Sequence, residues 1–281
     1  MADVLPSGRS IESSPAAYRS GSGTPLLLLH GFTGSWRLWL PLLPALSTTF
    51  DVFAPTLPGH HGGPPIELAR PFTLDQLTDR VERELDARDI DRPHVVGSSM
   101  GGGLAIQLAA RGRVASCIGV APGFDWPADD PTRQQVADSL RRQHTRTRNS
   151  RWITPLVMRS SRLRRQVLAH SMNRGDLVPA REAVRMARAA ADCTIADAII
   201  DGIAGGSALL DHLDRIAMPT LIAWPEDDHV APRTGRSRFE TEIPGVTVRT
   251  LPGVGHLPMY DDTDLLVNTI TQWVLTQEVS R

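Results

Sequence analysis

The chain has 281 residues, of which 41% are hydrophobic and 22% charged, the composition of an ordinary globular protein. Its 30 basic and 31 acidic residues nearly cancel, so no global field favours nucleic-acid binding. Cys117 and Cys193 lack the spacing of metal ligands, which argues against a cysteine-based zinc site or a disulfide framework. All the cations are arginine, and the absence of lysine excludes Schiff-base and Walker-type phosphate chemistry.

The apolar runs predict no membrane-spanning segment. Leu26–Leu29 is typical of their length and falls far short of the roughly 20 residues needed to cross a bilayer. Residues Met1–Gly21 lack the apolar core of a signal peptide. We therefore expect a cytoplasmic location, no metal and no cofactor, and the oligomeric state stays open.

From Thr24 onward, short apolar runs alternate with amphipathic stretches, a pattern typical of buried strands connected by helices. The predicted strands are Leu26–Leu29, Val52–Ala54, His94–Gly97, Ser116–Ala121, Thr220–Trp224 and Val246–Leu251, with at most one edge strand before them around Ala16–Arg19. The predicted helices are Trp36–Leu46, Leu74–Arg88, Met100–Arg111, Leu209–Ile216 and Thr263–Gln277. This alternation predicts an α/β fold with a mostly parallel central sheet flanked by helices.

Residues 124–205 interrupt the alternation. They show several helical patterns and no convincing strand, so we interpret them as a helical cap inserted into a core of residues 1–123 and 206–281. Residues 124–190 hold 14 arginines against 6 acidic residues. Solvated helix faces are the simpler interpretation of this charge, and an anion-binding or membrane-touching surface is the alternative.

The sharpest motif is Gly97-Ser98-Ser99-Met100-Gly101, between a predicted strand and a predicted helix. Glycines two residues before and after Ser99 allow a turn so tight that its hydroxyl projects outward. The start of the helix supplies free N–H groups and a positive dipole end. Ser99 is therefore the candidate nucleophile, whereas Ser98 lacks a glycine at both spacings.

A serine nucleophile needs a base, and the base needs an orienting carboxylate. His256 is the candidate base because it lies on a Gly/Pro loop between the last strand and the last helix, from which it can reach the end of the sheet. The carboxylate is expected after the preceding strand, where Glu226, Asp227 and Asp228 follow one another.

An oxyanion hole is the third requirement of this chemistry. His30-Gly31-Phe32 ends the first long strand, and the glycine lets the chain turn. We expect the Phe32 and Met100 N–H groups to converge on one point and bind an oxyanion.

The order of these residues resembles the α/β-hydrolase fold superfamily, in its serine esterase and lipase-like branch, over nearly the whole chain from about residue 20. The family's acid commonly stands in a Trp-Gly-x-x-Asp-x-x-x-Pro string, which residues 224–232 match with Asp228 as the acid and Pro225 in place of glycine. The resemblance implies a catalytic triad of Ser99, Asp228 and His256. Some branches carry the acid after the sixth strand, so Asp125 stays an alternative.

Other parts of the chain also bear on the resemblance. Leu57-Pro58-Gly59-His60-His61-Gly62 is similar to a family loop near the active site, and we expect His60 to be structural. The inserted cap falls where the family carries its cap. A serine at the elbow departs from the nucleophilic-aspartate branches, which argues against haloalkane dehalogenase and epoxide hydrolase.

The resemblance implies a hydrolase that cleaves a carboxylic ester of a small to medium apolar substrate through an acyl-enzyme. Phe32, Trp126 and Trp152 are the expected substrate-binding side chains, and the cap arginines are expected to face solvent. A small molecule is thus the expected partner, with no nucleic acid. The same triad could instead serve C–C hydrolysis, thioester hydrolysis, cofactor-free haloperoxidase or hydroxynitrile lyase chemistry, and a non-catalytic small-molecule receptor is a further alternative.

Overall fold

The computed structural model describes residues 12–13, 16–126, 130–231 and 234–279. Within them, one eight-stranded sheet has the order β1-β2-β4-β3-β5-β6-β7-β8. The strands are β1 Glu12–Ser13, β2 Ala17–Ser20, β3 Pro25–Leu29, β4 Asp51–Pro55, β5 His94–Ser98, β6 Ser116–Val120, β7 Thr220–Pro225 and β8 Thr247–Leu251. Only the β1–β2 and β2–β4 pairs are antiparallel. The predicted α/β fold with its mostly parallel sheet is confirmed.

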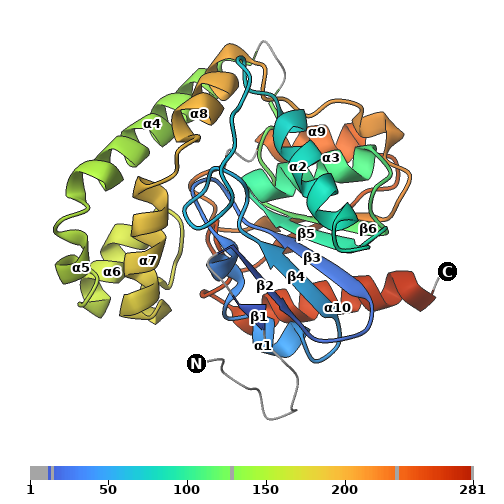
Figure 1. The fold of residues 1–281 in the computed structure, drawn as a ribbon, viewed down its shortest axis with the longest axis horizontal. Helices are drawn as coiled ribbons and strands as arrows, with labels where there is room; N and C mark the ends of the chain where they lie inside the picture. The colour runs from blue at the N-terminus through green and yellow to red at the C-terminus, as the bar shows by residue number, and fades with distance from the viewer. Residues whose placement is uncertain (1–11, 14–15, 127–129, 232–233, 280–281) are drawn as a thin grey trace.

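Helices cover both faces of the sheet (Figure 1). They are α1 Leu43–Leu46 and α10 Thr263–Val279 on one face, and α2 Leu74–Asp86, α3 Met100–Ala110 and α9 Thr234–Glu242 on the other. In β3, Leu27 and Leu29 pack into the core beneath α2 and α3, whereas Leu26 and Leu28 pack toward α1 and α10. Alternate residues point to opposite faces, so a strand buried on both sides is continuously apolar.

Three helix predictions differ from the structure. Trp36–Leu46 is a 3₁₀ helix at Trp36–Trp39 followed by the short α1, because Pro41 and Pro44 lack the N–H donors that a continuous helix needs. Leu209–Ile216 forms only a 3₁₀ turn at Leu213–Arg215. Helix α9 was not predicted, since Phe239 is the one large apolar residue within its bounds and leaves no apolar stripe to detect.

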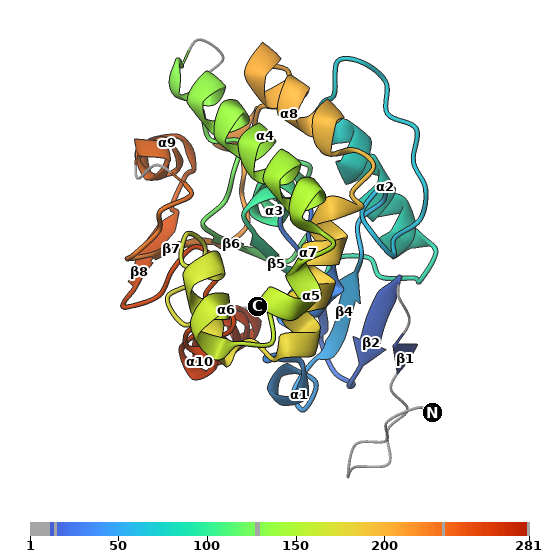
Figure 2. The ribbon, with the colours of Figure 1, turned by 90° about the vertical axis from the view of Figure 1, so that its left-hand side faces the viewer.

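The segment between β6 and β7, residues 124–205, is called the insertion below. Its helices are α4 Thr132–Ser150, α5 Thr154–Val157, α6 Ser161–Leu168, the 3₁₀ helix Gly175–Leu177, α7 Ala180–Ala191 and α8 Ala196–Gly205. No strand occurs in the part of the insertion that the structure describes. Figure 2 shows these helices gathered in front of the sheet, where α4 packs on α7 and α8. Across the described ranges, no helix is long and apolar enough to cross a membrane.

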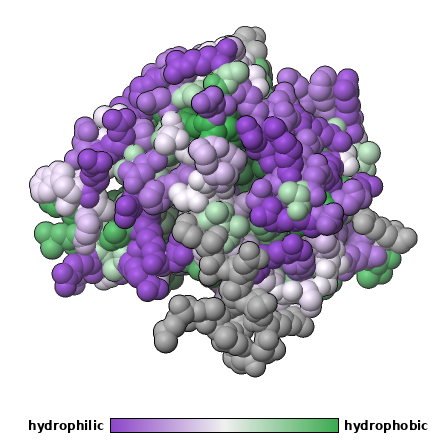
Figure 3. Space-filling model, viewed as in Figure 1, coloured by the Kyte–Doolittle hydropathy of each residue, from purple (hydrophilic) through white to green (hydrophobic). Residues whose placement is uncertain are grey.

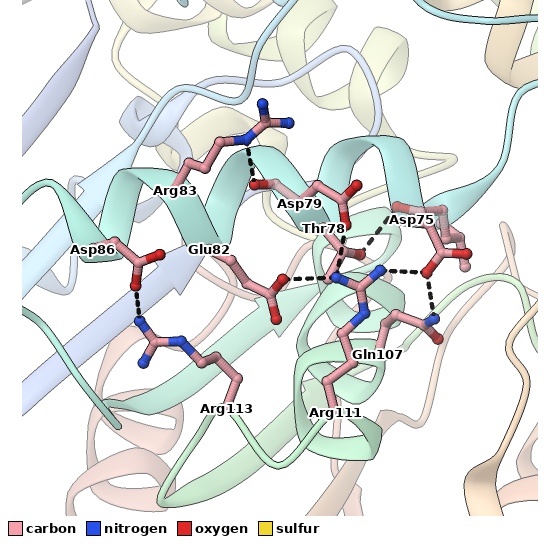
Figure 4. A network of polar contacts seen from close by, with 10 residues as sticks. Asp75, Thr78, Asp79, Glu82, Arg83, Asp86, Gln107, Arg111 and Arg113 are labelled. Carbon is pink, nitrogen blue, oxygen red and sulfur yellow. Dashed lines mark hydrogen bonds and ion pairs between the residues drawn. The ribbon is translucent and has the colours of Figure 1, made fainter.

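A polar network fixes α2 to α3 (Figure 4). Arg111, just after α3, reaches three acids of α2: its guanidinium contacts Asp75, lies 2.8 Å from Asp79 and 2.7 Å from Glu82. The Gln107 amide donates a 3.0 Å hydrogen bond to Asp75. Because α3 begins directly after the serine elbow, this network supports the element on which the candidate site is built.

Candidate active site

Ser99 occupies a strained turn between β5 and α3, with φ 54° and ψ −118°. The turn requires glycine on both sides: a Cβ on Gly97 would lie 2.0 Å from the Gly101 carbonyl oxygen, and one on Gly101 would lie 2.2 Å from that of Leu29. The Ser99 N–H donates to the Val120 carbonyl at 2.9 Å. The predicted strand-to-helix elbow is therefore present, and the surrounding backbone holds the serine in a conformation that normally favours glycine.

The loop after β3 lies directly against the serine. A Cβ built on Gly31 would be 3.3 Å from Ser99 Cβ and 3.9 Å from its Oγ, so a larger residue would be crowded against the serine here. In the described chain, neither the Phe32 nor the Met100 N–H donates a hydrogen bond, and Met100 is the first residue of α3. Both donors are thus free to bind an incoming oxyanion.

His30 holds this loop in place through hydrogen bonds, a role that the sequence analysis did not predict. Its ring is fully buried, its Nε2 accepts the Leu57 N–H at 2.9 Å, and its Nδ1 donates to the Gly31 carbonyl at 2.8 Å. Burial lowers the pKa of His30 well below its ordinary value, so the ring is neutral with its proton on Nδ1. His60 packs edge-on against it with ring centroids 4.9 Å apart, and burial lowers the pKa of His60 to about 4. His60 does not line the cavity around Ser99.

His256 and Asp228 meet across two loops. Asp228 follows β7 and His256 follows β8, and Asp228 Oδ2 lies 2.8 Å from His256 Nδ1. The other carboxylate oxygen accepts the N–H groups of Val230 at 2.8 Å and Ala231 at 2.9 Å. Burial by itself would raise the pKa of Asp228, but the bonds from His256 and the two amides outweigh it and hold the pKa below its ordinary value. Asp228 is therefore the ionised partner of the histidine.

The other candidate acids are engaged elsewhere. Glu226 accepts the Gly253 N–H at 2.9 Å, and Asp227 accepts the Asn173 amide at 2.8 Å. Asp125 is 2% exposed, and Oδ2 of its carboxyl has no partner among the described residues. Burial raises the pKa of Asp125 to about 7. Among the described residues, Asp228 is thus the one acid that hydrogen-bonds His256. Pro232, which closes the matched string, lies outside the described residues.

The loop that carries His256 is tied to the insertion. The Leu257 N–H donates to the Ser171 carbonyl at 2.8 Å. Asp261 accepts the N–H groups of Gly255 at 2.8 Å, Asn173 at 2.9 Å and Arg174 at 2.7 Å. The residues on either side of His256 are therefore fixed by contacts with the insertion or with Asp261. No local sequence signal marks Asp261, because two of its three partners, Asn173 and Arg174, lie more than 80 residues away along the chain.

A cavity of about 660 Å³ opens between the core and the insertion. Its core wall contains Phe32, Ser99 and His256, which the sequence had placed in one site. The insertion contributes an apolar wall and, from α4, a polar one. The apolar residues are Leu140, Met158, Val167, Leu168, Met172 and Met186, and the polar ones are Ser139, Gln143, His144, Thr147 and Ser150. The volume is in the range of small-molecule sites.

Two expected substrate-binding residues lie outside this cavity. Trp126 packs in the core against Phe124, with ring centroids 6.5 Å apart, and Trp152 is 78% exposed at the end of the insertion. The presence of a tryptophan in the sequence does not show whether its side chain lies in the core, in a cavity or at the surface. The arginines of the insertion were expected to face solvent and to take no part in the site. Arg142 and Arg146 are exposed, but they also line the cavity.

Comparisons with known proteins identify related chains. The model of the alpha/beta hydrolase family matches residues 26–269. Epoxide hydrolase EphH of Mycobacterium tuberculosis is 28% identical, with 70% of this chain and 93% of that protein covered. A pimeloyl-[acyl-carrier protein] methyl ester esterase of Nitrosomonas europaea is 27% identical, with 85% and 91% covered.

Two further comparisons concern length and fold. The chain matches the dihydrolipoyllysine-residue acetyltransferase component of the acetoin cleaving system of Cupriavidus necator at 29% identity but spans only 61% of its length. The solved structure of a thermophilic esterase from Thermogutta terrifontis has a TM-score of 0.68 at 20% identity, with 98% of this chain and 97% of that chain covered. At that identity, the likeness concerns the fold alone.

Proposed function

The chain belongs to the alpha/beta hydrolase family, and from that premise we propose that it is a serine esterase that hydrolyses carboxylic esters through an acyl-enzyme. One observation carries the proposal: a strained serine and a carboxylate-held histidine line the same cavity. A strained backbone conformation persists only where the surrounding structure enforces it. Such strain is typical of functional sites, where a side chain must be held in a reactive position. The name of the Nitrosomonas relative, a methyl ester esterase, agrees with this reaction type.

In the proposed reaction, Ser99 Oγ attacks the ester carbonyl carbon while Nε2 of His256 takes the hydroxyl proton. Asp228 stabilises the imidazolium, and the Phe32 and Met100 N–H groups bind the oxyanion. The tetrahedral intermediate collapses, and His256 returns the proton to the departing alkoxide, which leaves as alcohol. A water molecule, deprotonated by the same histidine, then releases the acid and restores Ser99.

The relationship to an epoxide hydrolase does not favour epoxide opening for this chain. In the nucleophilic-aspartate branches the elbow carries a carboxylate, and here that position is Ser99. The apolar wall of the cavity supports an apolar acyl group, for which each additional buried methylene should strengthen binding by about 0.8 kcal/mol until the cavity is filled.

A fluorophosphonate probe and a series of p-nitrophenyl esters test the proposal. We expect one adduct, on Ser99, and a kcat/KM that rises with acyl length before it levels off. Ser99→Ala should abolish labelling and reduce kcat by about four orders of magnitude. Ser98→Ala is the matched control, since Ser98 is its buried neighbour outside the cavity. An adduct elsewhere, or turnover of thioesters or vinylogous diketones without ester turnover, would contradict the proposal.

A further inference from the structure

Large apolar side chains are exposed at the outer end of the insertion, and four of them are more exposed than the other large apolar side chains of residues 152–167. Trp152 is 78% exposed, Leu156 68%, Leu163 42% and Val167 53%. Leu163 and Val167 are four residues apart on α6 and so share one face of that helix. Figures 1 and 2 both show α5 and α6 next to each other, at the left-hand edge of the molecule in Figure 1, and Figure 3 shows hydrophobic residues at that edge. We call these four residues the outer patch.

The outer patch lies in the most basic part of the chain. Residues 139–170 contain nine arginines and no aspartate or glutamate, although the whole chain has a net charge of −1. Three of the nine have partners: Arg141 pairs with Asp201, Arg165 with Asp176, and Arg164 donates to backbone carbonyls. The other six form no ion pair within the described ranges, and we call them the unpaired arginines. They are Arg142, Arg146, Arg148, Arg151, Arg159 and Arg162.

One residue of the outer patch and two of the unpaired arginines line the cavity around Ser99. Val167 belongs to the outer patch and also lines the cavity, where it is half exposed. Arg142 and Arg146, one turn apart on α4, line the same cavity and also a groove of about 320 Å³ on the outer surface of α4. A surface that contacted this end of the insertion would therefore also contact residues that line the cavity around Ser99.

Exposed tryptophan and leucine beside unpaired arginines are suited to one kind of surface. Apolar side chains enter the boundary between lipid headgroups and acyl chains, tryptophan is stable at that depth, and arginine binds headgroup phosphates while its stem stays in apolar surroundings. A second copy of the chain is a poorer partner, because facing patches would bring two sets of unpaired arginines together.

We propose that the outer end of the insertion docks on the surface of an anionic lipid bilayer. The outer patch enters the headgroup boundary, the unpaired arginines contact phosphates, and the cavity lining at Val167, Arg142 and Arg146 lies next to the lipid. Docking does not depend on the proposed function. If both hold, the substrate is an ester that partitions into a bilayer and enters the cavity without crossing water.

Vesicle sedimentation tests the docking without any assay of activity. Wild-type protein is mixed with phosphatidylcholine vesicles and with vesicles of phosphatidylcholine and phosphatidylglycerol. We expect binding to the anionic vesicles that weakens at high salt, with much weaker binding to the neutral ones. Trp152 is the most exposed tryptophan among the described residues, so its fluorescence should shift to the blue on binding.

Two variants remove the two components of the surface. Leu156→Gln with Leu163→Gln should abolish the fluorescence shift, and Arg148→Gln with Arg159→Gln should weaken binding by about fivefold per arginine. The matched controls are Leu275→Gln on α10 and Arg249→Gln on β8, which are exposed residues outside the insertion and should leave binding unchanged. Circular dichroism checks that each variant is folded.

Three results would overturn the docking proposal. Equal binding to neutral and anionic vesicles would remove the role of the arginines, and loss of binding in the control variants would remove the role of this surface. Concentration-dependent dimers in light scattering that Leu156→Gln with Leu163→Gln abolishes would assign the patch to a second copy. Ser99→Ala should bind vesicles like the wild type, so a failure of docking is distinguishable from a failure of the esterase proposal.

Discussion

Asp228 holds His256 with one carboxylate oxygen and its own loop with the other. Oδ2 lies 2.8 Å from His256 Nδ1, while Oδ1 accepts the N–H groups of Val230 and Ala231. The carboxylate is thus oriented from both sides, and the imidazole that it orients faces the cavity with its second nitrogen. A histidine held in this way has one defined tautomer, with the proton on Nδ1.

Replacement of Asp228 should therefore disturb the tautomer of His256 rather than the fold. Asp228→Asn should lower kcat for p-nitrophenyl esters by three to four orders of magnitude at neutral pH, by analogy with other triads (about 10⁴). Asp125→Asn is the matched control and should leave kcat within about threefold, because Asp125 has no hydrogen bond to His256. If Asp125→Asn is the crippling change, the assignment of Asp228 fails.

The same Asp125→Asn variant should change stability in a pH-dependent way. Burial raises the pKa of Asp125 to about 7, whereas an unfolded aspartate titrates near 3.8. Between these values the folded state binds more protons than the unfolded state, so this group lowers stability as the pH rises toward 7. Asparagine carries no charge to desolvate. We expect urea unfolding to show similar stability near pH 4 and a gain of a few kcal/mol for the variant above pH 7. A gain that is independent of pH would contradict this account.

His30 should affect turnover through the oxyanion loop. His30→Ala removes the bonds to Leu57 and Gly31, which leaves the Phe32 N–H without a fixed position. We expect kcat to fall by about 10²-fold with little change in KM, the effect of a misplaced oxyanion donor. His61→Ala, an exposed histidine in the neighbouring loop, is the control. An unchanged kcat in folded His30→Ala protein would show that the loop keeps its geometry without the histidine.

Asp261 should position His256 without touching substrate. Asp261→Ala removes the acceptor of three backbone N–H groups, one of them on Gly255 beside the histidine. We expect about tenfold lower kcat at unchanged KM and a loss of roughly 1–3 kcal/mol in the free energy of unfolding, since amide groups lose a charged acceptor. Asp262→Ala is the adjacent control: among the described residues its carboxylate accepts only the Leu265 N–H at the start of α10, so the variant should lose stability and keep activity. Equal losses of kcat in both variants would assign the effect to general destabilisation.

The sequence by itself determined the parallel strands and the elbow, but not the edge strand β1, because at most one strand was expected before Leu26. Leu26–Leu29 and Cys117–Ala121 carry no polar side chain apart from the cysteine thiol because these strands are buried on both faces, and that requirement can be read along the chain. The glycines around Ser99 were equally readable, since the close approach of Gly97 to Gly101 and of Gly101 to β3 leaves no room for a Cβ. The prediction of one continuous helix at Trp36–Leu46 was wrong, although Pro41 and Pro44 were visible in the sequence.

Only the tertiary structure decided which groups meet. Four acids were candidates for His256, and the choice of Asp228 rests on a 2.8 Å contact between two loops that follow neighbouring strands. Trp126 and Trp152 look alike in sequence, yet one is buried in the core and the other faces solvent beside the unpaired arginines. Contacts between loops depend on how elements that are distant in the sequence pack together. The hydrophobic pattern along the chain does not predict that packing.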